Sequence, residues 1–288
     1  MAVNDEQSNA GPALRRGVPR IGPDLWPRVA AAVAMGLAAL VVAWFGGVVF
    51  VAFWWLASVV VLWEWQRIVR GERLAERVAL GALALAPAAL FALHNSALAA
   101  SATLVVGALA VGWVAGPAAR IWAGAGVLYA GALVVSLGLL RASPNYGLAS
   151  ILWLFAVVWG TDVAAYFAGR LIGGPKLWPR VSPGKTWSGA IVGALAGAAL
   201  GLLLGGWTHR IDRLFWLGLA AAVVSELGDL FESALKRRFG VKDSSRLIPG
   251  HGGLMDRLDA FIAASLFATV FAAANSEGSF IASGLFRW

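Results

Sequence analysis

Acidic residues inside apolar segments are the part of this sequence that could do chemistry. Glu226 and Asp229 lie three residues apart in one apolar stretch, and Asp256 and Asp259 repeat that spacing at the start of another. Residues three apart on a helix share a face, and both helices border the same loop, so we expect the two pairs to converge. Oxygen ligands from two helices, with positions left for water and phosphate, predict a Mg²⁺ site for nucleotide chemistry.

A fifth carboxylate, Asp162, lies in a further apolar segment. An ionised Asp at the centre of a bilayer costs on the order of 3 kcal/mol, so each of these side chains must face a cavity, a cation or a basic partner. The structural alternative is that Asp229 and Asp256 only pair with Arg257 or Lys236.

The loop between the two pairs carries groups suited to phosphate. Its glycines let the backbone approach phosphate oxygens and begin the next helix, whose N-terminus favours anions. His251 stands between glycines, which favours substrate contact over core packing. The alternative is a basic loop that only orients the protein or binds anionic lipid. The cations beside the carboxylates are Lys236, Arg237, Lys242 and Arg246, and the glycines are Gly250, Gly252 and Gly253.

A second loop, residues 170–188, contains Gly184-Lys185-Thr186, which is similar to the end of a P-loop. A P-loop also needs glycine five positions before Gly184, where this chain has Pro179, and we expect no strand before it. The segment is therefore not a P-loop. We expect Lys185, with the hydroxyls of Ser182 and Thr186, to hold phosphate at the start of the next helix.

The composition shows that these residues must be positioned by membrane-spanning elements. The chain is 60% apolar and 13% charged, against about 45–50% and about 25% in soluble domains, so it is a membrane protein. It has no cysteine, which excludes disulfides and thiolate metal sites and leaves oxygen as the expected metal ligand. The net charge of +8 could indicate a protein that binds nucleic acid. The positions of the charges along the chain indicate instead that they orient the protein in the membrane.

We predict an all-α, polytopic integral membrane protein with about nine transmembrane helices. The polar N-terminal tail, with no signal-peptide apolar region, is expected to be cytoplasmic. The third span is short and contains Pro87, so it could be kinked or partly re-entrant. The expected organisation is a tail at 1–27, N-terminal membrane helices at 28–147, a catalytic core at 148–276 and a second tail at 277–288. The predicted spans are 29–45, 48–65, 79–93, 97–115, 121–140, 148–169, 187–207, 214–231 and 257–275.

Charge distribution tests this topology. With the N-terminus inside, 19 of the 23 Lys and Arg residues fall on the cytoplasmic side, as the positive-inside rule requires. Only Arg141, Arg210, Arg213 and Arg287 remain outside. Both basic loops are therefore predicted to be cytoplasmic.

Glycine recurs every four residues in the seventh predicted span, at Gly189, Gly193, Gly197, Gly201 and Gly205. Such a smooth face admits close backbone approach by another helix. Packing within the molecule and a dimer interface are the two interpretations.

The stretch Ser233–Asp259 resembles the signature of the phosphatidate cytidylyltransferase (CDP-diacylglycerol synthase) family. Upstream, Asp162, Ser182-Pro183 and Lys185-Thr186-Trp187 also resemble that family, as does Glu64-Trp65. The matching signature positions are Ser233, Leu235, Lys236-Arg237, Lys242-Asp243, Ser245, Ile248-Pro249, His251-Gly252-Gly253 and Asp256-Arg257-Leu258-Asp259.

The resemblance implies a metal-dependent enzyme of the bacterial inner membrane, commonly a homodimer, with its site on the cytoplasmic face. Its substrates would be CTP and phosphatidic acid, and its cofactor Mg²⁺, with a second cation left open. Asp229 and Asp256 would be the main metal ligands, with Asp259 and Asp162 nearby. The catalytic positions would be Asp229, Asp256, Lys242 and Asp243. The substrate-binding positions would be Ser182, Lys185, Thr186, Ser233, Lys236, Arg237, His251, Gly252, Gly253 and Arg257.

Two other classes of membrane protein are the alternatives. An ion-coupled transporter would place carboxylates such as Asp162 and Glu226 near mid-membrane and would not need the glycine-histidine loop. A CDP-alcohol phosphotransferase would carry an Asp-Gly-x2-Ala-Arg motif, which this sequence lacks. The clustering of acids at one rim favours the cytidylyltransferase interpretation.

Overall fold

The computed structural model describes residues 25–205, 211–248, 252–277 and 280–287. In this part of the chain the helices are α1 (Leu25–Phe45), α2 (Gly47–Val69), α3 (Leu74–Leu93), α4 (Ala97–Val114), α5 (Gly116–Arg141), α6 (Gly147–Leu171), α7 (Trp187–Gly205), α8 (Ile211–Arg238) and α9 (Met255–Ala274), with a short 3₁₀ helix, η2 (Ile281–Leu285). The prediction of an all-α polytopic membrane protein is confirmed.

Eight of the described helices, α2 to α9, are long and apolar enough to cross a membrane. The described apolar part of α1, Ala30–Phe45, is shorter than a usual span. The third helix is longer than predicted: α3 begins at Leu74 and contains Pro87 without ending there. The first turn of α3 contains the charged residues Glu76 and Arg77. Because these residues lower the local hydropathy, the span predicted from hydropathy began only at residue 79.

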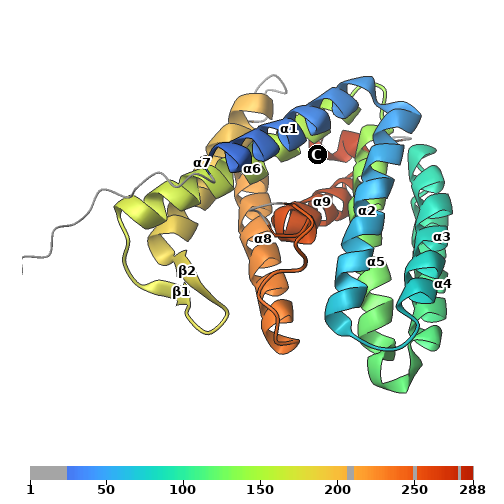
Figure 1. Ribbon diagram of the computed structural model, residues 1–288. Helices are drawn as coiled ribbons and strands as arrows, with labels where there is room; N and C mark the ends of the chain where they lie inside the picture. Colours follow the sequence, from blue (N-terminus) through green and yellow to red (C-terminus); the bar gives the residue numbers. More distant parts are fainter. Residues whose placement is uncertain (1–24, 206–210, 249–251, 278–279, 288) are drawn as a thin grey trace, which may run out of the picture.

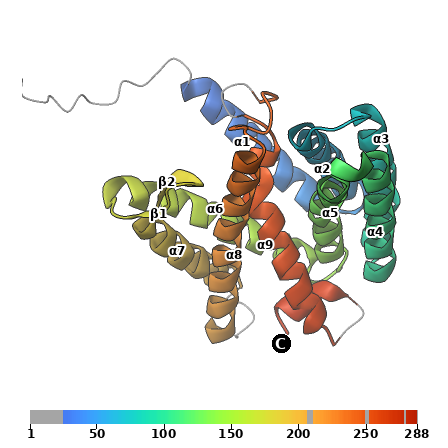
Figure 2. The ribbon, with the colours of Figure 1, turned by 90° about the horizontal axis from the view of Figure 1, so that it is seen from below.

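The helices form two groups with α9 between them. Figure 1 shows α2, α3, α4 and α5 running side by side, while α6, α7 and α8 lie together on the other side. In the view from below, α9 lies between the groups, and it packs against both α5 and α8 (Figure 2). Helix α1 contacts α2 and α6 and so crosses from one group to the other.

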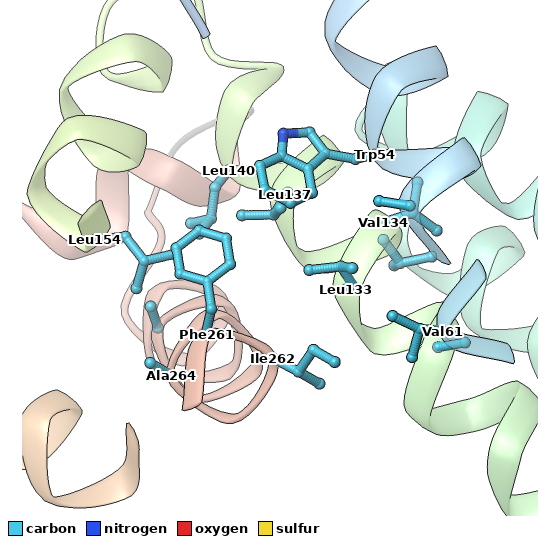
Figure 3. Close-up of a cluster of buried hydrophobic side chains, with 14 of the residues drawn as sticks. Trp54, Val61, Leu133, Val134, Leu137, Leu140, Leu154, Phe261, Ile262 and Ala264 are labelled. Carbon is cyan, nitrogen blue, oxygen red and sulfur yellow. The ribbon is translucent and has the colours of Figure 1, made fainter. Parts of the chain in front are cut away.

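Buried aromatic and aliphatic side chains hold α9 in this central place. Phe261 of α9 stacks on Trp54 of α2, with ring centroids 5.5 Å apart, and on Phe155 of α6, with centroids 5.2 Å apart. Leu133 and Leu137 of α5 complete the cluster, which Figure 3 shows. Because offset aromatic pairs add to the burial energy, this cluster fixes the position from which α9 presents its acidic N-terminus.

The glycine-rich face of α7 packs against α6 and α8. A Cβ at Gly193 would lie 2.8 Å from the Cβ of Ala165, and one at Gly201 would lie 2.8 Å from Cγ2 of Val157. All five glycines of the repeat are buried. The interpretation as packing within the molecule is therefore confirmed, and this face is not available as a dimer interface.

A two-stranded antiparallel hairpin joins α6 to α7, formed by β1 (Lys176–Trp178) and β2 (Ser182–Thr186). The expectation that no strand precedes Gly184-Lys185-Thr186 was wrong, because these residues themselves end β2. The strands are too short and too polar to show an alternating pattern in the sequence. The rejection of a P-loop stands, since Pro179 still occupies the glycine position.

Several loops that carry the basic residues lie at one end of the molecule. In Figure 1 the α2–α3 loop, the α4–α5 junction, the hairpin and the C-terminal end of α8 are all at the lower side. This grouping agrees with the topology predicted from the charge distribution.

Candidate active site

A cavity of about 730 Å³ lies between α6, α7, α8, α9 and the hairpin. It is bounded by helices that come from separate parts of the sequence and meet only in the folded chain. Its chemically active lining consists of Asp162, Tyr166, Arg170, Lys176, Lys185, Thr186, Glu226, Asp229, Asp256, Arg257 and Asp259. The cavity thus combines carboxylates and cations on apolar helices. Charged groups there cost free energy, and for that reason they usually have a function.

The predicted metal-binding carboxylates all line this one cavity. Asp162 comes from α6, Asp229 from α8, and Asp256 and Asp259 from α9. The Asp259 carboxyl interacts electrostatically with both Asp229 and Asp162. Glu226 also lines the cavity, and its Oε1 atom is buried without a hydrogen-bond partner.

These donors fit a magnesium ion in their chemistry. No three acidic or histidine side chains among the described residues are close enough to form a complete protein cage. Mg²⁺ in nucleotide enzymes normally takes only one or two carboxylates and completes its octahedron with water and substrate phosphate. The unpartnered, buried Oε1 of Glu226 is one further oxygen at this cavity that a cation could take as a ligand.

Asp229 is held by two neighbours. Lys185 at the end of β2 places its Nζ 2.8 Å from Asp229 Oδ2, and the same Nζ donates to the Glu226 carbonyl at 3.3 Å. Ser233, one turn later on α8, donates its hydroxyl to Asp229 Oδ1 at 3.3 Å. Lys185 is therefore in the cavity, while Ser233 orients a carboxylate rather than lining the cavity itself.

Asp256 has more hydrogen-bond partners than Asp229. Its carboxylate accepts hydrogen bonds from Lys236 Nζ at 2.7 Å, from the Ser244 amide at 3.1 Å and from the Gly253 amide at 2.8 Å. Lys236 Nζ also lies 2.6 Å from Oε2 of Glu232, which is fully buried. The predicted alternative, pairing of Asp256 with Lys236, does occur, and it occurs at the wall of the same cavity.

The remaining predicted residues divide into three sets. Thr186 and Arg257 line the cavity, and Thr186 Oγ1 also accepts the Gly189 amide at 3.1 Å, which caps the start of α7. His251 lies outside the described residues. The predicted residues that do not line the cavity are Ser182, Ser233, Lys236, Arg237, Lys242, Asp243, Gly252 and Gly253.

Lys236 and Arg237 do not line the cavity and instead make contacts that hold neighbouring elements together. Arg237 donates its Nε to the Val181 carbonyl at 3.4 Å and so ties the hairpin to α8. Lys242 and Asp243 are exposed in the loop after α8.

Two cations and one aromatic residue of the cavity were not among the predicted site residues. Arg170 and Lys176 line it, and the Arg170 guanidinium lies over the ring of Tyr166, 4.7 Å from its centroid. In the sequence, Arg170 and Lys176 were counted only among the positive charges of the 170–188 loop. The signal available in the sequence was that both cations belong to the same basic loop as Lys185.

Comparisons with known proteins show the family to which this chain is similar. The model of the cytidylyltransferase family matches residues 26–274. The phosphatidate cytidylyltransferase of Brucella suis is 42% identical over 265 residues, covering 88% of this chain and 95% of that protein. The Brucella abortus protein of the same name is 40% identical over 276 residues, covering 92% and 99%.

A more distant relative matches a shorter region. The phosphatidate cytidylyltransferase of Bacillus subtilis is 44% identical over 126 residues, covering 43% of this chain and 47% of that protein. The match of the family model over most of the chain and the two nearly full-length similarities decide the assignment. This membrane protein belongs to the cytidylyltransferase family and is a nucleotidyltransferase.

Proposed function

We propose that this protein transfers CMP from CTP to phosphatidic acid, giving CDP-diacylglycerol and pyrophosphate for phospholipid synthesis. The observation that carries the proposal is the cavity in which carboxylates of α6, α8 and α9 meet Lys185 of the hairpin. The relatives named phosphatidate cytidylyltransferase, at 40–42% identity over nearly the whole chain, support the choice of substrates.

The proposed reaction is a direct displacement at phosphorus. An oxygen of the phosphatidate phosphate monoester bonds to the α-phosphorus of CTP, and the bond from that phosphorus to the pyrophosphate oxygen breaks. A phosphate monoester is largely dianionic near pH 7, since its second pKa is about 6. The nucleophile is therefore already charged, and the site does not need a strong general base.

The main obstacle is the repulsion between two polyanions. Lys185, Arg257, Arg170 and Lys176 line the cavity and would hold the phosphates of both substrates while they approach. Fixed cations in a site of low dielectric constant stabilise developing negative charge more than they would in water. In phosphoryl transfer, positioning and charge neutralisation supply most of the catalysis.

The same proposal includes Mg²⁺ as cofactor, held by Asp229 and Asp256 with Asp259 and Asp162 nearby. The ion would neutralise phosphate charge and polarise the phosphorus under attack. The chain's own part is to keep these carboxylates at the cavity wall: Ser233 orients Asp229, and the Ser244 and Gly253 amides orient Asp256. The number of carboxylates that line the cavity, five with Glu226, is also compatible with a second cation.

We further propose that the protein lies in the bacterial inner membrane as a homodimer, with the cavity open to the cytoplasm. The positive-inside distribution supports the orientation, since the loops that carry Lys185 and Lys242 fall on the cation-rich side. Phosphatidate has its phosphate at the membrane surface, which suits a site at the ends of spans.

The test is a reconstituted reaction. Purified protein in detergent is incubated with phosphatidate, Mg²⁺ and CTP, dCTP, ATP or GTP in turn, and pyrophosphate release is measured with a matched reaction lacking phosphatidate. We expect release only with cytidine nucleotides, phosphatidate and Mg²⁺ together. Equal release without phosphatidate, or with every nucleotide, would contradict the proposal.

A further inference from the structure

Glu64 of α2 is a fully buried carboxylate that the proposed reaction does not use. It lies far from the signature loop in the sequence but contacts it in four places. Oε1 accepts the Ser245 hydroxyl at 2.5 Å and the Leu254 amide at 2.9 Å. Oε2 accepts the Ser244 hydroxyl at 3.1 Å and the Met255 amide at 2.6 Å. One side chain thus joins both ends of the segment that leads into α9.

The Leu254 and Met255 amides are the first N–H groups of α9. Such groups have no partner inside their own helix, and Leu254 at the N-cap position has no side chain that could cap them. Glu64 supplies the missing acceptor from another helix. A negative charge is also favourable at this position, because the helix dipole places partial positive charge at the N-terminus.

The same segment orients Asp256. The Ser244 and Gly253 amides, which both donate to Asp256, lie directly beside the atoms that Glu64 holds. A Cβ added to Gly253 would collide with the Ser244 hydroxyl and the Glu64 carboxylate, so the chain is closely packed here. A shift of the loop would therefore move the two amides that aim the Asp256 carboxylate.

We propose that Glu64 is a positioning residue, which holds Ser244, Ser245 and the start of α9 so that Asp256 faces the cavity. The role of Asp256 in this inference rests on the proposed function, whereas the anchoring of the loop by Glu64 does not. Glu64 acts through Asp256 and does not line the cavity among the described residues.

The first test is Glu64→Gln, which keeps the volume of the side chain. Each carboxylate oxygen now accepts one hydroxyl and one backbone amide. Whichever way the glutamine amide turns, its NH₂ faces a backbone N–H that cannot become an acceptor. Hydrogen–deuterium exchange of the ligand-free protein should show the Leu254 or the Met255 amide, whichever faces the NH₂, exchanging at least about tenfold faster, while amides near the C-terminal end of α9 stay unchanged.

The second test is the steady-state reaction of the same variant. If Glu64 aims Asp256, kcat should fall by about tenfold or more, the Mg²⁺ concentration for half-maximal rate should rise, and KM for CTP should change little. Glu64→Asp keeps the charge but has a shorter side chain, and should recover part of kcat. Ser245→Ala removes one of the four donors and keeps the proposal testable if Glu64→Gln does not fold.

Thr269→Val is the matched control. Thr269 is a buried polar residue of α9, far along the helix from the loop, whose hydroxyl lies 2.8 Å from the Ser265 carbonyl and 3.2 Å from the Ser136 carbonyl. It should lower the melting temperature without changing kcat per folded enzyme.

The outcomes separate the two claims. Unchanged exchange at Leu254 and Met255 in Glu64→Gln would overturn the anchoring. Faster exchange with wild-type kcat and Mg²⁺ dependence would overturn the positioning role. Faster exchange in a protein whose wild type shows no phosphatidate-dependent turnover would support the anchoring and contradict the proposed function instead.

Discussion

At the scale of single residues, two of the carboxylates that line the cavity, Asp229 and Asp256, are each paired with a lysine. Lys185 pairs with Asp229, and Lys236 pairs with both Asp256 and Glu232. The two lysines differ in what they face. Lys185 lines the cavity, so it can contact substrate phosphate, whereas Lys236 is directed into a buried pair of acids.

Asp229→Asn tests the metal assignment. The amide keeps the shape but removes the charge that a divalent cation requires, so Mg²⁺-dependent turnover should fall by about 100-fold or more, while membrane insertion is unchanged. Turnover is measured as pyrophosphate release at several Mg²⁺ concentrations. Glu76→Gln, an exposed acid on α3, is the control and should keep wild-type turnover; near-normal turnover of Asp229→Asn would remove Asp229 from the metal site.

Lys236→Met tests whether Lys236 serves structure or substrate. Removing one partner of a buried ion pair leaves uncompensated charge and typically costs about 3–5 kcal/mol, so the melting temperature should fall clearly. Adding Glu232→Gln to this variant should restore part of the stability, because it removes one of the two orphaned charges. An unchanged melting temperature together with a raised KM for CTP would instead show that Lys236 binds substrate.

At the scale of elements, the pairing of α7 with α6 decides where the hairpin and Lys185 are placed. The α7 glycines bring the two helices so close that a Cβ at Gly197 would lie 3.0 Å from the Val157 carbonyl of α6. The hairpin connects the ends of these two helices, so its position depends on their distance. A face of small residues is thus a requirement of the site as well as of the fold.

Gly197→Val should separate α6 from α7. Overpacking of a close helix contact typically costs about 1–3 kcal/mol, and the displaced hairpin should also reduce turnover. Thermal unfolding in detergent and pyrophosphate release measure the two effects. Ala199→Leu adds comparable bulk on the exposed side of the same helix and should change neither; equal losses in both variants would mean that the added volume, rather than the α6–α7 contact, is responsible.

At the scale of the whole molecule, the chain has two groups of membrane helices joined through α9, and the site lies at the cation-rich end. Its lack of cysteine allows a direct test of orientation. Glu72→Cys and His94→Cys place single exposed thiols at opposite ends of α3. In spheroplasts of expressing bacteria, a membrane-impermeant maleimide should label His94→Cys at once and Glu72→Cys only after permeabilisation. The reverse pattern would place the cavity on the outer side.

The sequence by itself determined the class of protein, most spans, the pairing glycines of α7 and the helices that carry the acids. These features depend on local composition and on helical periodicity, which a window of about 20 residues contains. The start of α3 and the hairpin could not be predicted from the sequence, because charged or short segments give little periodic signal.

Only the tertiary structure decided which of these residues meet. It placed Arg170 and Lys176 in the cavity, directed Lys236 toward Glu232 and Asp256, and joined Glu64 to a loop 180 to 191 residues later. The physical reason is that a contact between helices depends on how their faces pack across the molecule. Spacing along one helix predicts which side chains share a face, but not what that face will touch.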